Sequence, residues 1–95
     1  MLKGKISSID ELKSFLIDYL KDKNAKVYFF GSRAKGSFNE FSDIDVAIDG
    51  NNIDFAFLKF LIEESNLPQK VDIINMNSIS EEFKEEILKT GIRWL

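Results

Sequence analysis

The segment Asp43–Asp49, with the sequence DIDVAID, alternates polar and apolar side chains over seven residues. Successive side chains of a β-strand point to opposite faces, so this alternation predicts a strand. Its carboxylates then share one face, and Ile44, Val46 and Ile48 point to the other. The segment therefore predicts a strand with one wet face and one buried face.

The rest of the chain alternates helical and strand patterns, without a linker, a repeat or a low-complexity segment. Capping-box spacing and periodic apolar residues predict the helices, and short apolar runs predict the other strands. The predicted elements are a helix from Ser8–Glu11 onward, a strand at Lys26–Phe30, a helix at Ile53–Glu64, a strand at Val71–Ile74 and a helix from Ser78–Glu81 to a stop at Gly91. This order predicts one domain of the α/β (α+β) class over residues 1–95.

The composition limits the chemistry that such a domain can perform. The chain has 13 Lys and Arg residues against 16 Asp and Glu residues, and this net charge of −3 disfavours direct binding to nucleic acid. It contains no cysteine and no histidine, which removes thiolate nucleophiles, imidazole bases and Cys/His zinc sites. Proton transfer and metal binding are therefore left to carboxylates.

The apolar residues are spread along the chain. No apolar run approaches the roughly 20 residues of a membrane span, and the first ten residues have no signal-peptide core. We therefore expect a cytoplasmic protein that does not contact a membrane.

A small basic turn follows the predicted strand at Lys26–Phe30. Backbone N–H groups at such a turn can bind phosphate, Gly31 allows close approach, and Ser32, Arg33 and Lys35 could add donors and positive charge. An ordinary tight turn is the alternative. Gly31 and Gly36 have the glycine spacing of a P-loop, but the lysine and the Ser or Thr that should follow the second glycine are missing.

Asp43 and Asp45 lie two residues apart on one face of the predicted strand. Two carboxylates so close repel each other unless a positive charge lies between them, and Mg²⁺ favours such oxygen ligands. A solvated strand face is the alternative. A calcium loop is disfavoured, because Ala47 and Ile48 occupy positions that need a ligand and a glycine.

Together these residues resemble a known signature. Gly31–Ser32, the basic segment with Ala34, Lys35 and Gly36, and then Ser42–Asp45 resemble the G-S…D-x-D signature of the nucleotidyltransferase superfamily, which includes DNA polymerase beta and the aminoglycoside nucleotidyltransferases. The chain is more closely similar to the minimal nucleotidyltransferases, which are often the antitoxin half of HEPN/MNT pairs. Lys35 stands where members of the family often carry arginine.

The resemblance runs from about Val27 to the C-terminus, and it implies a small mixed sheet flanked by helices. It also implies a third carboxylate on a neighbouring strand, which Asp72 supplies within the apolar run Val71–Ile74. An acid at a strand edge that faces water is the alternative for Asp72. In the implied site, Asp43, Asp45 and Asp72 hold two Mg²⁺ ions, and Asp72 also orients or deprotonates the acceptor hydroxyl. The implied contacts to a nucleoside triphosphate, with ATP expected, come from Gly31, Ser32, Arg33, Lys35 and Ser42.

Three functional hypotheses follow from the resemblance. The first is transfer of AMP to a tyrosine of a HEPN partner, which makes the chain an antitoxin. The second is a module that neutralises the partner by contact alone, and the third is a small-molecule nucleotidyltransferase. The helix at Ile53–Glu64 has apolar residues around more than one face, so we expect another chain, either the HEPN partner or a second copy, to cover part of it. A helix buried deep in the core is the alternative.

Overall fold

The computed structural model describes residues 6–31, 34, 36 and 42–95. Its centre is a four-stranded sheet in the order β3-β2-β1-β4. The strands are β1 (Lys26–Phe30), β2 (Ile44–Asp49), β3 (Val71–Asn75) and β4 (Ile92–Arg93). β2 runs antiparallel to β1 and parallel to β3, and β4 runs antiparallel to β1. The sheet is therefore mixed, as predicted.

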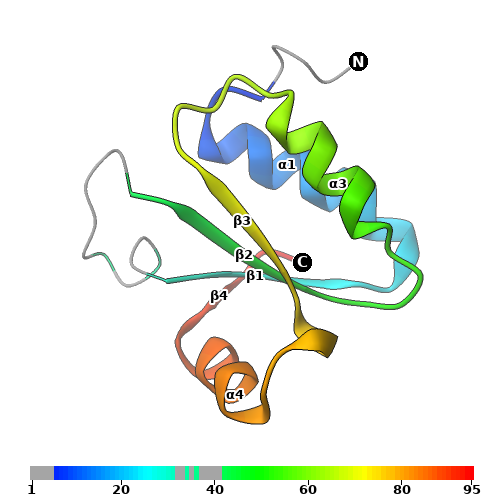
Figure 1. Ribbon diagram of the computed structural model, residues 1–95, viewed down its shortest axis with the longest axis vertical. Coiled ribbons are helices and arrows are strands. Elements are labelled where there is room, and N and C mark those ends of the chain that lie inside the picture. The colour runs from blue at the N-terminus through cyan, green and yellow to red at the C-terminus, as the bar shows by residue number, and fades with distance from the viewer. Residues whose placement is uncertain (1–5, 32–33, 35, 37–41) are drawn as a thin grey trace.

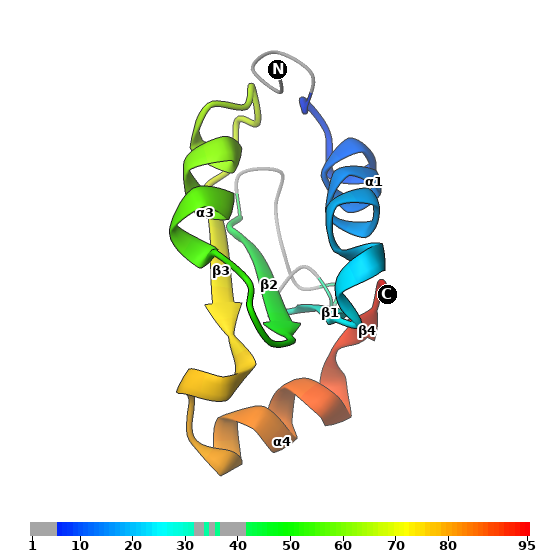
Figure 2. The same ribbon diagram turned by 90° about the vertical axis from the view of Figure 1, so that its right-hand side faces the viewer.

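In the described part of the chain, three α-helices cover the sheet (Figure 1). Helices α1 (Ile9–Leu20) and α3 (Phe55–Glu63) lie over one face, and α4 (Glu81–Thr90) lies on the other side, as Figure 2 shows. Short 3₁₀ helices follow α1 at Lys21–Lys23 and β3 at Met76–Ser78. Within the described residues, no helix is long and apolar enough to cross a membrane.

The main core lies between the sheet and the helices α1 and α3. Ile44, Val46 and Ile48 of β2 are completely buried there, as the alternation predicts. The leucines of α1 and the inner residues of α3 pack against them, namely Leu12, Leu16, Leu20, Leu58 and Ile62. Burial of one face therefore determines the orientation of β2, and it places Asp45 on the opposite face.

The opposite face of the sheet is only partly open to water. Ala47 is completely buried there, in a second apolar cluster with Phe30, Met76 and Ile87. Helix α4 and the turn before it thus cover this face beyond Asp45. The face predicted to be wet is therefore covered at Ala47, whereas Asp43 is exposed and Asp45 and Asp49 are half-buried.

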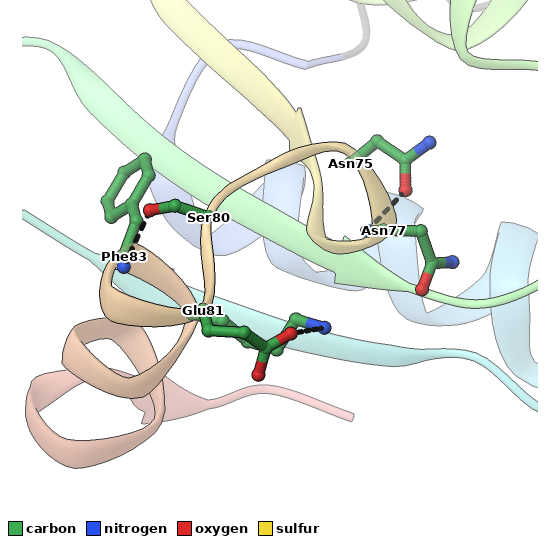
Figure 3. Close-up of polar contacts among 6 residues, drawn as sticks. Asn75, Asn77, Ser80, Glu81 and Phe83 are labelled. Carbon is green, nitrogen blue, oxygen red and sulfur yellow. Dashed lines mark hydrogen bonds and ion pairs between the residues drawn. The ribbon is translucent and has the colours of Figure 1, made fainter.

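The helix starts depend on single side chains. Ser8 caps α1 as predicted, because its Oγ accepts a hydrogen bond from the N–H of Glu11 (3.2 Å). The predicted start of α4 at Ser78 is wrong: Ser80 is the cap, and its Oγ accepts from the N–H of Phe83 (Figure 3). The residues before it form a 3₁₀ turn that buries Met76, so the helix begins two residues later.

The predicted helix at Ile53–Glu64 begins slightly later in the structure. Asp54 is its N-cap, with Oδ1 accepting from the N–H of Phe57 (3.0 Å), and α3 proper starts at Phe55. Asp54 is a better cap than Ile53 because its side chain can accept this hydrogen bond.

The sequence did not predict β4. Gly91 ends α4 as expected, and its N–H donates to the carbonyl of Ile87 (2.8 Å). The chain then pairs with β1, and the N–H of Trp94 donates to the carbonyl of Val27 (2.8 Å). The Trp94 ring stacks on Phe29 at 4.8 Å between centroids, which anchors the C-terminal segment to the core.

Candidate active site

The strand directions bring Gly31, Asp45 and Asp72 together at one end of the sheet. β1 and β2 are antiparallel, so the end of β1 lies beside the start of β2. β2 and β3 are parallel, so their starts lie side by side. In register, Asp45 lies opposite Phe30 on one side and opposite Asp72 on the other. Gly31 directly follows β1, and Asp45 and Asp72 lie on the neighbouring strands β2 and β3.

The electrostatics of Asp45 reflect this crowding. Burial raises the pKa of the Asp45 carboxyl above its ordinary value of 3.8, and the nearby charges of Asp72 and Asp43 raise it further. A hydrogen bond between the Asp45 and Asp72 side chains acts in the same direction, whereas Lys70 partly lowers the pKa. Asp43 and Asp72 thus lie close enough to Asp45 to raise the pKa of its carboxyl.

Lys70 is a member of this site that the sequence analysis missed. Its Nζ lies 3.8 Å from Oδ1 of Asp72, and its carbonyl accepts a hydrogen bond from the N–H of Ile44 (2.8 Å). The sequence held one signal for Lys70: it lies two residues before Asp72, directly ahead of the predicted strand at Val71–Ile74. The ion pair is largely exposed, so it adds little stability, but it places a positive charge at the edge of the acidic site.

Gly31 has a conformation and surroundings that only glycine fits. Its φ is +85°, and an added Cβ would overlap Oδ2 of Asp45. The backbone at Gly31 therefore approaches the Asp45 carboxylate closely because residue 31 has no side chain.

We predict that Gly31→Ala destabilises the protein and displaces Asp45. The positive φ alone costs about 1–3 kcal/mol, and the overlap with the carboxylate adds to this cost. Gly36→Ala is the matched control, because Gly36 has a φ of +84° but no atom within 4 Å of an added Cβ. Thermal unfolding of both variants measures the difference, and equal losses would show that Asp45 does not restrict residue 31.

The donor set of the site is compatible with a divalent cation. Asp45 and Asp72 lie close enough to share a proton, and a hard cation that prefers oxygen ligands could replace that proton. Within residues 6–31, 34, 36 and 42–95, however, no three acidic side chains are placed to hold an ion by themselves. Mg²⁺ often takes only one or two protein carboxylates and completes its shell with water and phosphate oxygens. The assignment of Asp43, Asp45 and Asp72 as metal ligands stays a prediction.

The structure describes part of the predicted nucleotide site. Gly31 and the half-buried Ser42 lie at the two ends of the connection between β1 and β2. Ser32, Arg33 and Lys35 lie outside the described residues, so their predicted contacts with phosphate stay predictions.

The match of the sequence to a family model defines the class of protein. Residues 11–94 match the family model "Polymerase beta, Nucleotidyltransferase", and the chain therefore belongs to this nucleotidyltransferase family. The fold class and the nucleotidyltransferase class predicted from the sequence are confirmed.

The similar curated proteins are named for one particular activity. The chain is 42% identical over 70 residues to the probable protein adenylyltransferase MntA of Haemophilus influenzae. This match covers 70% of this chain and 61% of that protein. It is 32% identical over 90 residues to a putative protein adenylyltransferase of Methanocaldococcus jannaschii, covering 90% of this chain and 96% of the relative. A second such protein of that organism is also 32% identical, over 87 residues, covering 82% of this chain and the whole of the relative. The match thus spans less than two thirds of the Haemophilus influenzae protein.

Two solved structures share the fold. One is a toxin–antitoxin crystal structure with AMP-PNP, at a TM-score of 0.64 and 21% identity, covering 87% of this chain and 72% of that chain. The other is a crystal structure of a mutant of the toxin–antitoxin pair MntA-HpeT, at a TM-score of 0.61 and 18% identity. This match covers 87% of this chain and 71% of that chain.

Proposed function

We propose that this protein is an antitoxin that transfers AMP from ATP to a tyrosine hydroxyl of a HEPN-domain toxin. The observation that carries the proposal is the position of Asp45, which has the Gly31 turn on one side and Asp72 on the other. Such an arrangement suits phosphoryl chemistry, because a phosphate-binding turn and acidic metal ligands must lie side by side. The names of the similar proteins support protein as the acceptor.

Each residue of the site has a distinct role in this proposal. Asp43 and Asp45 hold the cations, and the turn that begins at Gly31 seats the β- and γ-phosphates, with Ser32, Arg33, Lys35 and Ser42 as further contacts. Mg²⁺ ions bound there would neutralise the triphosphate and the charge that develops on the α-phosphoryl group. Asp72 contributes to the second metal site and orients the acceptor hydroxyl.

The proposed reaction is balanced without any further reactant. The tyrosine oxygen bonds to the α-phosphorus as the bond to the bridging oxygen of the β-phosphate breaks, and pyrophosphate leaves. The hydroxyl proton goes to Asp72, because the chain contains no histidine that could serve as a base.

A direct experiment can test the class of reaction, the nucleotide and the acceptor together. The protein is incubated with Mg²⁺, each of the four NTPs in turn and a candidate HEPN-domain partner, and the intact masses of both proteins are measured. We expect the mass of the HEPN protein to rise by one or more AMP groups with ATP and not with the other three NTPs. Neutralisation of the toxin without any mass change would instead support the contact module.

The surface of α3 is the observation that favours the second candidate function, neutralisation by contact. Leu58 and Ile62 of α3 are buried, but Phe57 and Phe60 are 46% and 55% exposed. These two phenylalanines are three residues apart and so lie on the same side of the helix. Large exposed aromatic side chains on one helix face are typical of a protein interface.

We predict that the double substitution Phe57→Ser and Phe60→Ser weakens association with another chain by at least about tenfold. Each substitution removes a ring whose apolar surface would be buried against the partner in the complex. Co-purification with the HEPN protein and light scattering of the protein alone distinguish a hetero-complex from a homodimer. Leu88→Ser is the matched control, because Leu88 is a similarly exposed apolar residue (52%) on α4. Loss of association only in the Leu88 variant would place the interface on α4 instead.

A further inference from the structure

Lys70 places a positive charge beside the acids of the candidate site. Its Nζ lies 3.8 Å from Oδ1 of Asp72, and Asp72 pairs in register with Asp45 on the neighbouring strand. The charge of Lys70 also lowers the pKa of the Asp45 carboxyl, against the effects of burial and of the two other acids. Lys70 therefore acts on two of the acids to which the proposed function assigns the divalent cations.

The backbone of Lys70 is held in place, whereas its side chain is exposed. The carbonyl of Lys70 accepts a hydrogen bond from the N–H of Ile44 (2.8 Å), directly ahead of the start of β3 at Val71. The Lys70 side chain is 72% exposed and that of Asp72 is 42% exposed. An exposed pair of this kind is weak, because water screens the charges and the lysine side chain loses rotamer freedom. A stronger ligand of the Asp72 carboxylate can therefore displace Lys70 without disturbing β3.

The Lys70 ammonium group lies where it would oppose a cation at Asp72. A unit positive charge within a few ångströms of a divalent cation repels it, and both need the oxygens of the same carboxylate. We infer that Lys70 competes with divalent cations for Asp72 and so weakens their binding to the acids, which favours a cation that arrives with a nucleoside triphosphate. This inference rests on the metal ligands assigned in the proposed function.

A triphosphate changes this competition in two ways. Its oxygens supply ligands that the carboxylates do not, since Mg²⁺ often takes only one or two protein carboxylates. Its negative charge also offers the Lys70 ammonium group another partner. The metal–triphosphate complex therefore does not meet the repulsion that a free cation meets at Asp72.

Binding of Mn²⁺ without any nucleotide tests this competition. Mn²⁺ is titrated into the protein at low ionic strength, and the free ion is measured by electron paramagnetic resonance. We expect Lys70→Gln to bind Mn²⁺ about three- to tenfold more tightly than wild type, because it keeps all three acids and loses the competing charge. Lys70→Arg keeps the charge, so its affinity should stay within about twofold of wild type.

Two controls separate competition at Asp72 from a general effect of charge. Lys26→Gln removes an exposed positive charge at the opposite end of the sheet, where Lys26 pairs in register with Asp49, so its affinity should stay within about twofold of wild type. In an Asp72→Asn background, Lys70→Gln should lose most of its effect, because the carboxylate for which Lys70 competes is gone. Equal Mn²⁺ affinities of wild type and Lys70→Gln would overturn the inference, and so would an equal gain in Lys26→Gln.

A second titration uses the complex of Mn²⁺ with a non-hydrolysable ATP analogue. The affinity for this complex should not rise in Lys70→Gln, and a rise equal to that for free Mn²⁺ would overturn the preference for the complex. Neither titration requires AMP transfer. Normal transfer with an unchanged Mn²⁺ affinity would overturn this inference alone, whereas the expected gain in affinity without any transfer would overturn the proposed reaction alone.

Discussion

Asp45→Asn should reduce AMP transfer to below about one-hundredth of the wild-type rate, which corresponds to about 2.7 kcal/mol of lost transition-state stabilisation. The amide keeps the shape of the carboxylate but is a poor ligand for Mg²⁺, so the fold persists while the metal site is lost. Asp43→Asn should have the same effect. Activity within tenfold of wild type at saturating Mg²⁺ would contradict the role of these two acids.

Asp49→Asn is the control for this experiment. Asp49 lies on the same strand and is half-buried, but it pairs in register with Lys26 at the opposite end of the sheet. An equal loss of activity in the Asp49 variant would mean that any change on β2 disturbs the site.

The same Asp45→Asn substitution should stabilise the protein when no divalent cation is present. Burial and the charges of Asp72 and Asp43 raise the pKa of Asp45, so the folded chain binds a proton at this site more tightly than the unfolded chain. The free energy of unfolding therefore falls as pH rises from about 3.8 through the raised pKa, and at neutral pH the charged Asp45 destabilises the fold.

Thermal unfolding in EDTA should show the variant as the more stable protein at pH 7. The difference should shrink as the pH falls toward 4, because the wild-type carboxyl is then protonated as well. A lower stability of the variant at pH 7 would mean that the Asp45 carboxylate makes favourable contacts that outweigh its repulsion.

Asp72→Asn should separate nucleotide binding from chemistry. In the proposed site, Asp43, Asp45 and the turn at Gly31 would still hold the metal–triphosphate complex in this variant, so the affinity for a non-hydrolysable ATP analogue should change little. The single-turnover rate should fall by roughly 10²–10⁴-fold, because the variant loses the general base. Loss of the base raises the energy of the transition state more than that of the bound ground state, so the rate falls while the nucleotide affinity is kept.

This substitution also removes the partner of Lys70, so Lys70→Gln is the necessary control. It breaks the same ion pair but keeps the acid, and we expect a rate within about tenfold of wild type, since an exposed ion pair is worth at most about 1 kcal/mol. Poor nucleotide binding with a normal saturated rate in the Asp72 variant would instead assign Asp72 to the nucleotide site.

The sequence was sufficient to predict the acids of the candidate site but not all of its neighbours. Asp43 and Asp45 follow from the spacing on one strand, and Asp72 was found only through the resemblance to a family. Lys70 was missed because its approach to Asp72 and its effect on Asp45 depend on the parallel pairing of β2 and β3. A cavity of about 320 Å³ that α3, the loop after it and β3 line together likewise depends on the tertiary structure.

Local features of the chain determined the buried face of β2 and the start of α1. The alternation of Ile44, Val46 and Ile48 acts through the two-residue period of a strand, and Ser8 caps its helix through atoms three residues away. Only the tertiary structure decided the burial of Ala47 under α4, the start of α4 at Ser80 and the pairing of β4 with β1. These depend on contacts between residues far apart in the chain, which the local pattern does not contain. A two-residue strand such as β4 forms only because it can pair with β1. Burial of Met76 in the second cluster stabilises the 3₁₀ turn before α4, so that α4 begins two residues later than predicted.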